Sequence, residues 1–588
     1  MKRFAGKIHN GSLVCSPEPG TYQGCRLLWR GYISNRDDIL GEAKRRGLAV
    51  EDGSDGDLFA LAYRCWGNAL QSWVLGEYCL AVFDDRASTL LLTHDALGLL
   101  PMFYSRTAAG VLFGSHLEDL VAKAGVNDLD EEFIADYVAN ISYSSRDTPY
   151  RTIKRLGVGS SLLYERETPV ELEGWDISRA RPVEGTEDEY AQIFLSLLDK
   201  GVQAALHAGG PVWSELSGGL DSSTVMCMAA RSGTANLGAV SIVYDQYAQT
   251  DESKWMQLVL DRYPAAWHRL DGDSALPYSE VPDRFCAEPG LHMVDWGGRR
   301  IYEEMVTTNG VAAVLTGQGG DLVFFGLGAE PYHLADLART LKLRRLFSEL
   351  TRWKAADRRR RSGLYWFANY IIGPLVSRLR GHSIRPVWHP GISPFIDPGY
   401  AKAMALDERY LRRPWHGRGT IEQSWFMEKL STVCGQIANL NQIPRTFDFR
   451  HPLLYRPLVE FMFCLPWEWK FNPETDRLLQ REALRGILPE PLRLRKAKTI
   501  YDQPCYEGLR RGKAWSALLT DDPLVARRGI VDRTRWIEAV GQARLGRAHF
   551  LPQFEAVASL EIWLRQLEDV KSGDPGILRG PATRVVTL

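Results

Sequence analysis

Short runs of apolar residues, separated by turn residues, dominate the first 175 positions. The runs at residues 26–31, 79–83, 89–93 and 110–113 are typical of strands, and helical spacing interrupts them at 38–46 and 57–66. This mixture predicts a layered α+β domain. A polar stretch at 176–189 is the expected linker.

The pattern then changes to alternating strands and helices. Apolar residues at Phe194, Leu197, Leu198 and Val202 predict a helix after the linker. Strands are expected at 211–216, 237–244 and 311–316, with helices at 222–231 and 251–263. Such alternation indicates a doubly wound parallel sheet. Beyond residue 329 the pattern is mostly helical, and it ends in a helix at 554–568.

A glycine-rich loop joins the first of these strands to its helix. Its sequence is Ser217-Gly-Gly-Leu-Asp-Ser-Ser223. Glycines allow backbone N–H groups to approach an anion, and a helix N-terminus attracts negative charge. We therefore expect a phosphate-bearing cofactor to bind at Ser217, Gly218, Gly219, Ser222 and Ser223. Asp221 would repel a bare phosphate, so we expect it to bind the cofactor through a divalent cation. The alternative is a serine-rich turn that caps a core helix. The loop is not a Walker A loop, because it does not end in Gly-Lys-Ser/Thr.

A second such loop, Thr316-Gly-Gln-Gly-Gly-Asp321, follows the strand at 311–316. Ligands of doubly wound sheets bind at the carboxyl ends of strands, so both loops should face one pocket. Asp221 and Asp321 are the predicted Mg²⁺ ligands, and Gly317 is a further phosphate contact. A glycine turn with an aspartate helix cap is the alternative. Glu252 begins a helix and faces either the metal or the substrate amine, unless it only stabilises the helix dipole.

Composition narrows the class of protein. A chain of 588 residues should hold two or three domains, and a net charge of −1 does not favour nucleic acid as a partner. No apolar run is long enough to span a membrane and no signal peptide precedes the first domain, so we expect a cytoplasmic protein with no membrane insertion. Nine scattered cysteines without a Cys-x-x-Cys pair predict reduced thiols.

These motifs resemble the class B asparagine synthetase superfamily along nearly the whole chain. The resemblance implies a degenerate glutaminase-like (Ntn-type) sandwich over residues 1–180. It implies an ATP-pyrophosphatase-type α/β domain with a parallel sheet and extra helices over 181–588, using ATP and Mg²⁺. Thr316 and Leu322 replace a serine and a glutamate of the family's SGxGxDE, and Tyr455 replaces an aspartate. The segment 488–498 resembles the one that carries the catalytic lysine, which makes Lys498 the candidate and Lys496 the alternative.

The N-terminal domain departs from the family in its nucleophile. Family members with glutaminase activity begin Met-Cys-Gly-Ile, whereas this chain begins Met-Lys-Arg-Phe. Trp29-Arg-Gly-Tyr-Ile33 stands where the family has F-N-G-E-I. Lysine or arginine cannot replace a thiol nucleophile. We therefore expect a glutaminase-like fold without glutaminase, and an amine on the same molecule as the activated carboxylate.

Two branches of the superfamily work in this way, the β-lactam synthetases and the lasso peptide cyclases. A basic, aromatic insertion at about 329–400 and the ending Leu560-Glu-Ile-Trp-Leu-Arg565 resemble the lasso cyclases. Ten Lys or Arg face two acids between 339 and 361; this run is a peptide- or protein-binding strip or a solvated helix face. The expected partners are a precursor peptide, a leader peptidase and a leader-recognition protein. A β-lactam-type cyclase and an ammonia-dependent amidotransferase remain the alternatives.

Overall fold

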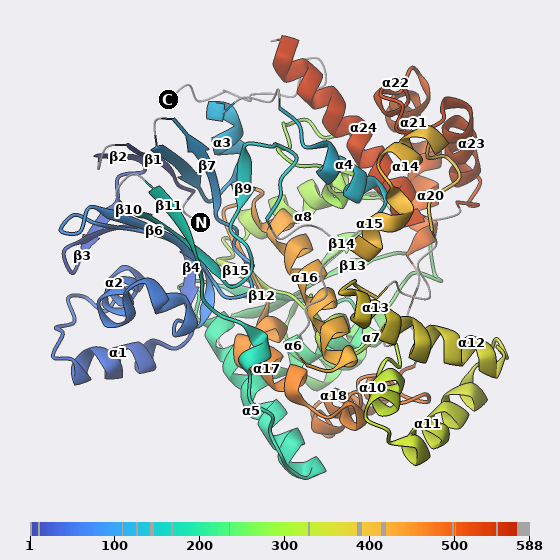
Figure 1. Cartoon of the computed structure of the whole chain (residues 1–588), viewed down its shortest axis with the longest axis horizontal. Coiled ribbons are helices and arrows are strands. Elements are labelled where there is room, and N and C mark those ends of the chain that lie inside the picture. Colours follow the sequence, from blue (N-terminus) through green and yellow to red (C-terminus); the bar gives the residue numbers. More distant parts are fainter. Residues whose placement is uncertain are drawn as a thin grey trace.

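The computed structural model describes most of the chain, and the two expected domains can be followed in Figure 1. The described residues are 3–9, 12–108, 110–124, 128–140, 146–165, 168–234, 236–326, 330–384, 391–412, 419–496, 499, 501–548 and 551–572. Position 180 lies between the short helix η2 (Ile177–Arg179) and α5 (Glu187–Leu206), in the stretch expected to be a linker.

The N-terminal domain consists of two antiparallel sheets. One sheet runs β11 (Thr168–Glu173), β10 (Ser160–Glu165), β6 (Thr89–His94), β5 (Gly76–Asp84), β4 (Cys25–Ile33) and β3 (Gly20–Tyr22). The other runs β2 (Ser12–Ser16), β1 (Ala5–His9), β8 (Gly110–Gly114), β7 (Phe103–Thr107) and β9 (Ile153–Arg155). The four strands predicted in this domain are therefore present, and their ends lie within a few residues of the predicted ends.

A hydrophobic core joins the two sheets. Phe4 and Phe113 from one sheet region pack with Leu28 and Phe83 from the other. Helices α1 (Arg36–Arg45) and α2 (Asp55–Trp66) cover the opposite face of the six-stranded sheet through a second apolar cluster. The predicted α+β sandwich is confirmed, with both helices on one outer face (Figure 1).

The second domain is built on a parallel sheet of five strands. Its order is β14 (Ala266–Asp271), β13 (Leu237–Val243), β12 (Val212–Glu215), β15 (Ala313–Leu315) and β16 (Asp448–Arg450). β12 pairs in parallel with both β13 and β15. The three predicted strands thus form the centre of the sheet, and β14 and β16 extend it at the two edges.

Both faces of this sheet are covered by helices. Successive strand residues point to opposite faces: Val212 joins the core formed with α5, α6 (Leu220–Arg231) and α7 (Ser253–Arg262), whereas Trp213 packs on α8 (Trp296–Thr308). The same split separates Leu315 from Val314. The sheet is therefore doubly wound, as the alternating pattern predicted.

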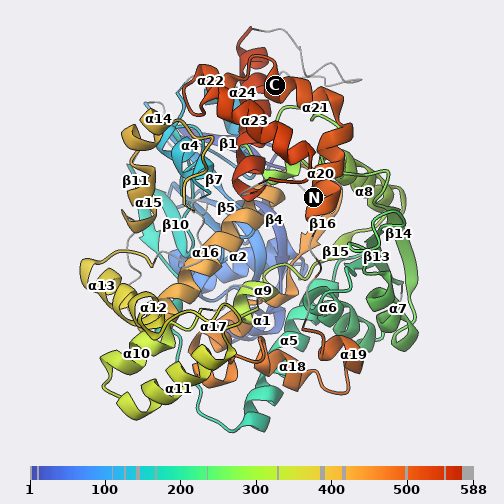
Figure 2. The same ribbon diagram turned by 90° about the vertical axis from the view of Figure 1, so that its right-hand side faces the viewer.

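Two helical groups flank the sheet, as Figure 2 shows. One group has its own core and comprises α10 (His333–Arg339), α11 (Leu343–Ala356), α12 (Gly363–Phe367), η4 (Ala368–Ile372) and α13 (Gly373–Arg380). The other packs on α3 (Leu117–Ala124) and α4 (Glu131–Val138) of the first domain. It comprises α20 (Asp502–Arg511), α21 (Lys513–Thr520), α22 (Leu524–Arg527), α23 (Arg533–Arg544) and α24 (Leu551–Ser572), the last containing the predicted 554–568 helix.

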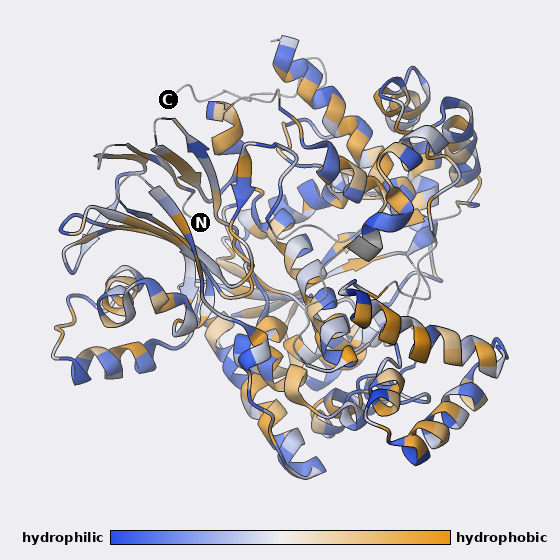
Figure 3. Cartoon of the chain, viewed as in Figure 1, coloured by the Kyte–Doolittle hydropathy of each residue, from blue (hydrophilic) through white to orange (hydrophobic). Residues whose placement is uncertain are grey.

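The remaining elements are short, apart from the long α16. They are η1 (Gly67–Ser72), η3 (Leu291–Met293), α9 (Gly320–Val323), α14 (Pro398–Ala403), α15 (Leu406–Arg412), α16 (Ile421–Asn441), η5 (Pro452–Leu454), α17 (Arg456–Cys464), η6 (Trp467–Trp469), α18 (Leu478–Ala483) and α19 (Glu490–Arg493). Apolar and polar residues alternate along most helices, as Figure 3 shows. In the described part of the chain, no helix combines the length and the apolar character needed to cross a membrane. All nine cysteines are free thiols.

Two helix glycines provide a matched test of this packing. A methyl group on Gly508 in α20 would lie 1.7 Å from the carbonyl oxygen of Pro277, whereas one on Gly541 in α23 meets nothing within 4 Å. We expect Gly508→Ala to destabilise the protein by about 1–3 kcal/mol through overpacking. Gly541→Ala should stabilise it by about 0.5–1 kcal/mol through helix propensity. Thermal unfolding followed by circular dichroism measures both; equal melting temperatures would show that α20 does not pack as described.

Candidate functional site

The two glycine-rich loops touch each other at the carboxyl ends of β12 and β15. A methyl group on Gly317 would lie 2.5 Å from the amide nitrogen of Ser222, and one on Gly320 would lie 2.4 Å from Cγ of Asp221. Real side-chain carbons do not approach so closely, so both positions require glycine. The loops expected to share one pocket are in backbone-to-backbone contact.

The first loop is folded by its own hydroxyl groups. The amide N–H of Ser217 donates to Oγ of Ser222 over 3.1 Å, and the two hydroxyl oxygens lie 2.9 Å apart. Gly218 has a φ of +76°, in the left-handed region that favours glycine. Helix α6 begins at Leu220 without a side-chain cap at Gly219. Its first N–H groups therefore remain available to an anion.

Ser223 differs from the other serine side chains of this loop. It is fully buried, and its hydroxyl oxygen has no hydrogen-bond partner among the residues that the structure describes. Ser222, in contrast, bonds within the loop. The structure thus places Ser217 and Ser222 at the loop and the Ser223 side chain in the interior behind it.

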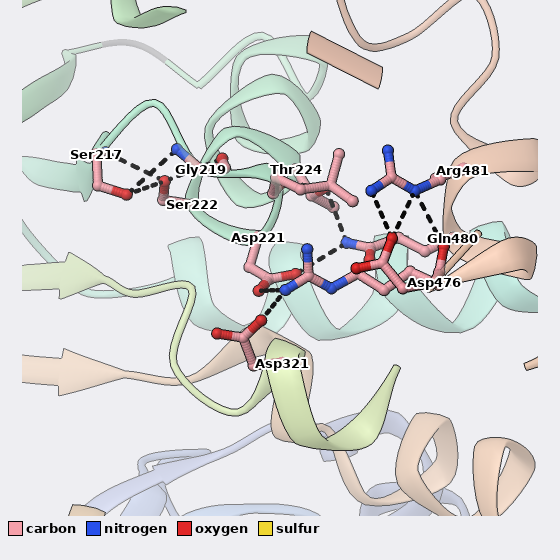
Figure 4. A network of polar contacts seen from close by, with 11 residues as sticks. Ser217, Gly219, Asp221, Ser222, Thr224, Asp321, Asp476, Gln480 and Arg481 are labelled. Atoms are coloured by element: carbon pink, nitrogen blue, oxygen red, sulfur yellow. Dashed lines mark hydrogen bonds and ion pairs between the residues drawn. The ribbon is translucent and has the colours of Figure 1, made fainter. Parts of the chain in front are cut away.

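The two aspartates converge on one arginine, as Figure 4 shows. Nη2 of Arg477 lies 3.1 Å from Oδ2 of Asp221 and is in still closer contact with Oδ1 of Asp321. Gln480 adds a bond from Nε2 to Oδ1 of Asp221 over 3.2 Å. A guanidinium therefore neutralises the paired carboxylates at the position where the sequence predicts a divalent cation.

Arg477 is held in an unusual backbone conformation. It stands directly before α18 with a φ of +53°, which costs energy for a residue with a Cβ atom. Gly326 gives its guanidinium room, because a methyl group there would lie 2.5 Å from Nε. Nε itself is buried without a partner among the described residues. This combination of strain and an unpartnered donor is typical of functional sites.

Glu252 lies beside the first loop, at the start of α7. A methyl group on Gly218 would lie 3.0 Å from Cβ of Glu252, and the Glu252 carboxylate pairs with Arg495. Arg495 also donates from Nη1 to the carbonyl oxygen of Gly218 over 3.0 Å and lies 4.7 Å from the ring centroid of Trp255. The Glu252–Arg495 pair thus braces the loop from the side of α7.

The two candidate lysines lie one and three positions after Arg495. Lys496 is exposed, and Lys498 lies outside the described residues. Sequence reasoning missed Arg477 and Gln480 as site residues. No local motif marks them, because they lie 256 and 259 residues from Asp221 along the chain.

The donor set can hold Mg²⁺. Within the described residues, no three His, Cys, Asp or Glu side chains gather as metal ligands. Mg²⁺, however, keeps several waters and binds through one or two carboxylates together with substrate phosphates. Asp221 and Asp321 already meet at one cationic atom, so the pair suits a hard divalent ion once the guanidinium moves aside.

Taken together, the fold and the loops define a class. A doubly wound parallel sheet with glycine-, serine- and aspartate-bearing loops at neighbouring strand ends belongs to nucleotide-binding α/β proteins. Asparagine synthase matches residues 194–565, so the chain belongs to the asparagine synthase family. A glutamine amidotransferase domain matches residues 18–174.

Curated relatives cover both domains. The chain is 22% identical over 508 residues to asparagine synthetase [glutamine-hydrolyzing] 3 of Bacillus subtilis, covering 82% of this chain and 76% of the relative. It is 25% identical over 520 residues to a putative asparagine synthetase [glutamine-hydrolyzing] of Mycobacterium bovis, covering 83% and 76%. The amidase chyE of Penicillium rubens is 24% identical over 318 residues, covering 50% and 45%. The chain is thus an asparagine synthetase-like protein of a family that forms amides with ATP.

The contact between the loops can be tested by one methyl group. Gly320→Ala places a carbon against the Asp221 carboxylate and should force the loops apart, whereas Gly41→Ala on α1 meets nothing within 4 Å. We expect Gly320→Ala to weaken ATP binding by roughly tenfold or more, equal to about 1.4 kcal/mol, and Gly41→Ala to leave it unchanged. Isothermal titration with a non-hydrolysable ATP analogue measures this. Wild-type affinity in Gly320→Ala would contradict the site.

Proposed function

We propose that the protein is an ATP-dependent, AMP-forming lasso peptide cyclase. It adenylates an Asp or Glu side chain of a core peptide and then forms an isopeptide macrolactam with the peptide's N-terminal amine. The observation that carries the ATP-dependent step is the meeting of two strand-end loops, whose carboxylates Asp221 and Asp321 share one cation at the start of α6.

The proposed reaction has two steps. A peptide carboxylate oxygen attacks the α-phosphorus of ATP, forming an acyl-adenylate, and pyrophosphate leaves. The N-terminal amine then attacks the acyl carbon, the amide forms, one proton is lost and AMP leaves. Ser217, Gly218, Gly219, Ser222 and Gly317 would hold the β and γ phosphates, with Ser222 N–H and its neighbours at the helix start as donors. Ser223, also predicted to bind phosphate, has a buried side chain, and its N–H already donates to the carbonyl oxygen of Gly219.

The remaining roles concern charge and protons. Asp221 and Asp321 would hold Mg²⁺, which neutralises negative charge on the leaving pyrophosphate. Lys498, or Lys496 in its place, would stabilise the acyl oxyanion. Glu252, whose carboxylate pairs with Arg495, is the candidate for accepting the amine proton.

The raised pKa values of the cysteine thiols support a reaction in which the attacking amine belongs to the substrate itself. Burial raises the pKa of every one of the nine thiols, to about 11 for Cys25 and about 12 for Cys79. A glutaminase nucleophile must be a thiolate, and a raised pKa disfavours it. None of these cysteines is therefore suited to release ammonia from glutamine.

The insertion supports a peptide substrate and a protein partner. Large apolar side chains stay exposed along the continuous helix from α12 to α13, namely those of Leu364, Phe367, Ile372, Val376 and Leu379. The basic residues Arg358, Arg359 and Arg360 precede this helix. An apolar stripe beside positive charge suits an acidic, amphipathic polypeptide. We propose that the precursor peptide, a leader peptidase or a leader-recognition protein binds here.

One alternative retains a specific observation in its favour. The relatives from Bacillus and Mycobacterium are named glutamine-hydrolysing asparagine synthetases. The same ATP site would serve an amidotransferase that uses free ammonia and an amino acid carboxylate. A β-lactam-type cyclase would use that site as well, with a small amino acid as its only organic substrate.

Reconstitution distinguishes these functions. Cleaved core peptide, ATP and Mg²⁺ should give a product lighter by one water, and ¹⁸O in the peptide's acid group should appear in AMP. Ammonium with aspartate, or a β-amino acid alone, should give no pyrophosphate above background. Mass spectrometry and a pyrophosphate assay measure these outcomes. Turnover with ammonium and aspartate but not with peptide would replace the cyclase by the amidotransferase.

The metal assignment has its own test. In the absence of nucleotide, Arg477 competes with a divalent ion for both carboxylates. Removing a cation at contact distance is worth about 1–4 kcal/mol. We therefore expect Arg477→Gln to bind Mn²⁺ roughly tenfold more tightly than wild type. Arg485→Gln, in which an exposed arginine paired with Glu482 is lost, is the control. Electron paramagnetic resonance of free Mn²⁺ measures the affinity.

A second substitution decides whether those carboxylates bind the ion. Asp321→Asn in the Arg477→Gln background should abolish the gain in Mn²⁺ affinity, because one of the two anionic ligands is removed. If Arg477→Gln and its double variant bind Mn²⁺ as wild type does, the two aspartates are not the metal ligands.

A further inference from the structure

Unpartnered hydrogen-bond donors gather where the N-terminal sandwich meets the second domain. We call Arg30, His292, Arg299, Asn439 and Arg445 the seam cluster. Each of its members has a buried side-chain nitrogen without a partner among the described residues, namely Nε and Nη1 of Arg30, Nδ1 of His292, Nε of Arg299, Nδ2 of Asn439 and Nη2 of Arg445. Buried polar groups are almost always hydrogen-bonded, so five such residues together require an explanation.

The seam cluster is assembled from both domains. Arg30 lies on β4 of the sandwich, and its Nη2 donates to the carbonyl oxygen of Asn441 at the end of α16 over 2.5 Å. Arg445, a few residues further, donates from Nη1 to the carbonyl oxygen of Leu440 over 2.8 Å. Arg30 and Arg445 are therefore anchored to the same turn, with one guanidinium arriving from each domain.

The other members approach from η3, α8 and α16. A methyl group on Gly290 would lie 2.6 Å from Nδ1 of His292 and 2.7 Å from Oδ1 of Asn439, so glycine leaves space that these polar groups border. Arg299 lies on α8, one helical turn before Glu303, which also pairs with Arg445. Five segments of the chain thus bring nitrogen donors to one buried region.

Buried charges of both signs lie in this region. The carboxylate of Glu303 faces three guanidiniums, at 2.6 Å from Arg445 and 4.0 Å from both Arg299 and Arg284. Asp448 is the other acid close to Arg30. Arg299 also lies near the buried carboxyls of Asp295 and Glu215, and burial raises the pKa of both, to about 6 for Asp295. A raised pKa weakens the ionised form of these acids, so they offset the arginines less than exposed carboxylates would.

The pKa values of two histidines in this region reflect the positive charge of the neighbouring arginines. Burial lowers the pKa of His292 well below its ordinary value, and the neighbouring Arg299 and Arg445 lower it further. Burial and the nearby Arg30 act in the same direction on the pKa of His116. Both rings are therefore neutral at pH 7, and the guanidiniums repel any further positive charge from the seam.

We propose that the seam cluster binds a small oxyanion, a phosphate or a carboxylate. Such an ion has several acceptor oxygens that can bond to these N–H groups, and its negative charge is attracted by the guanidiniums. A neutral amine or a cation would leave the N–H donors unsatisfied and add repulsion. Arg30, the residue that stands in place of the family's asparagine in F-N-G-E-I, supplies two of the unpartnered nitrogens.

The site is separate from the strand-end loops of the proposed ATP site. Its members lie on β4, η3, α8, α16 and the turn before β16, whereas Asp221 and Asp321 bond to Arg477, directly before α18, and Asp221 also bonds to Gln480 on α18. Anion binding here does not depend on the proposed cyclase activity. It would join the two domains through a shared counterion, since Arg30 belongs to one domain and Arg299 and Arg445 to the other.

The experiment uses the full-length protein and inorganic phosphate as the probe. A saturating non-hydrolysable ATP analogue is present throughout, so that phosphate cannot occupy the strand-end loops. Equilibrium dialysis with ³²P-phosphate at constant ionic strength should show one saturable site in wild type. Arg299→Met and Arg30→Met should each weaken it at least tenfold. Arg300→Met, an exposed neighbour on α8 paired with Glu280, should bind as wild type does.

Two further measurements keep the result decisive. Acetate that displaces phosphate, with chloride ineffective at the same concentration, identifies a carboxylate as an alternative occupant. An anion that is already bound would hide the site, so desalted protein is denatured and its released ions are measured by chromatography. Equal phosphate binding in Arg299→Met, Arg30→Met and wild type would sink the proposal. So would wild type that binds no phosphate and releases no anion, because water alone would then fill the seam.

Discussion

The repulsion between Asp221 and Asp321 governs the second domain's site. Two carboxylates at neighbouring strand ends are stable only with a cation between them. The chain supplies that cation from Arg477, a residue in a left-handed conformation in front of α18. The requirement extends to the backbone, because Gly317, Gly320 and Gly326 must all lack side chains for the loops and the guanidinium to meet.

The sequence predicted those features that depend on neighbouring residues. The central strands of the parallel sheet, the glycine loops after β12 and β15 and the start of α6 all follow from local patterns, and the structure contains each of them. The edge strand β16 has only three residues, which are too few for a periodic signal. β14 contains charged and aromatic residues that do not give the apolar pattern of a buried strand. The sandwich was predicted as a class, but its strand order was not.

Site residues that arrive from distant segments escaped prediction. Arg477 and Gln480 reach Asp221 across about 255 residues of chain, and their role appears only when the sheet brings α18 beneath α6. Arg495 was noticed as part of a motif, yet its bonds to Gly218 and Glu252 could not be foreseen from spacing. Glu252 was expected to face metal or amine. In the structure its carboxylate pairs with Arg495.

The seam between the domains is made of buried charged and polar groups. Arg30 from the first domain lies near Arg445 of the second, beside Arg299. Burial, with Arg299 nearby, lowers the pKa of Arg445 to about 10. Buried polar bonds fasten the same seam: Glu77 of β5 accepts from the backbone and the ring of His451 at 2.6 and 2.9 Å. The first domain is therefore built into the structure of the second. These contacts give the first domain a structural role that does not depend on any reaction of its own.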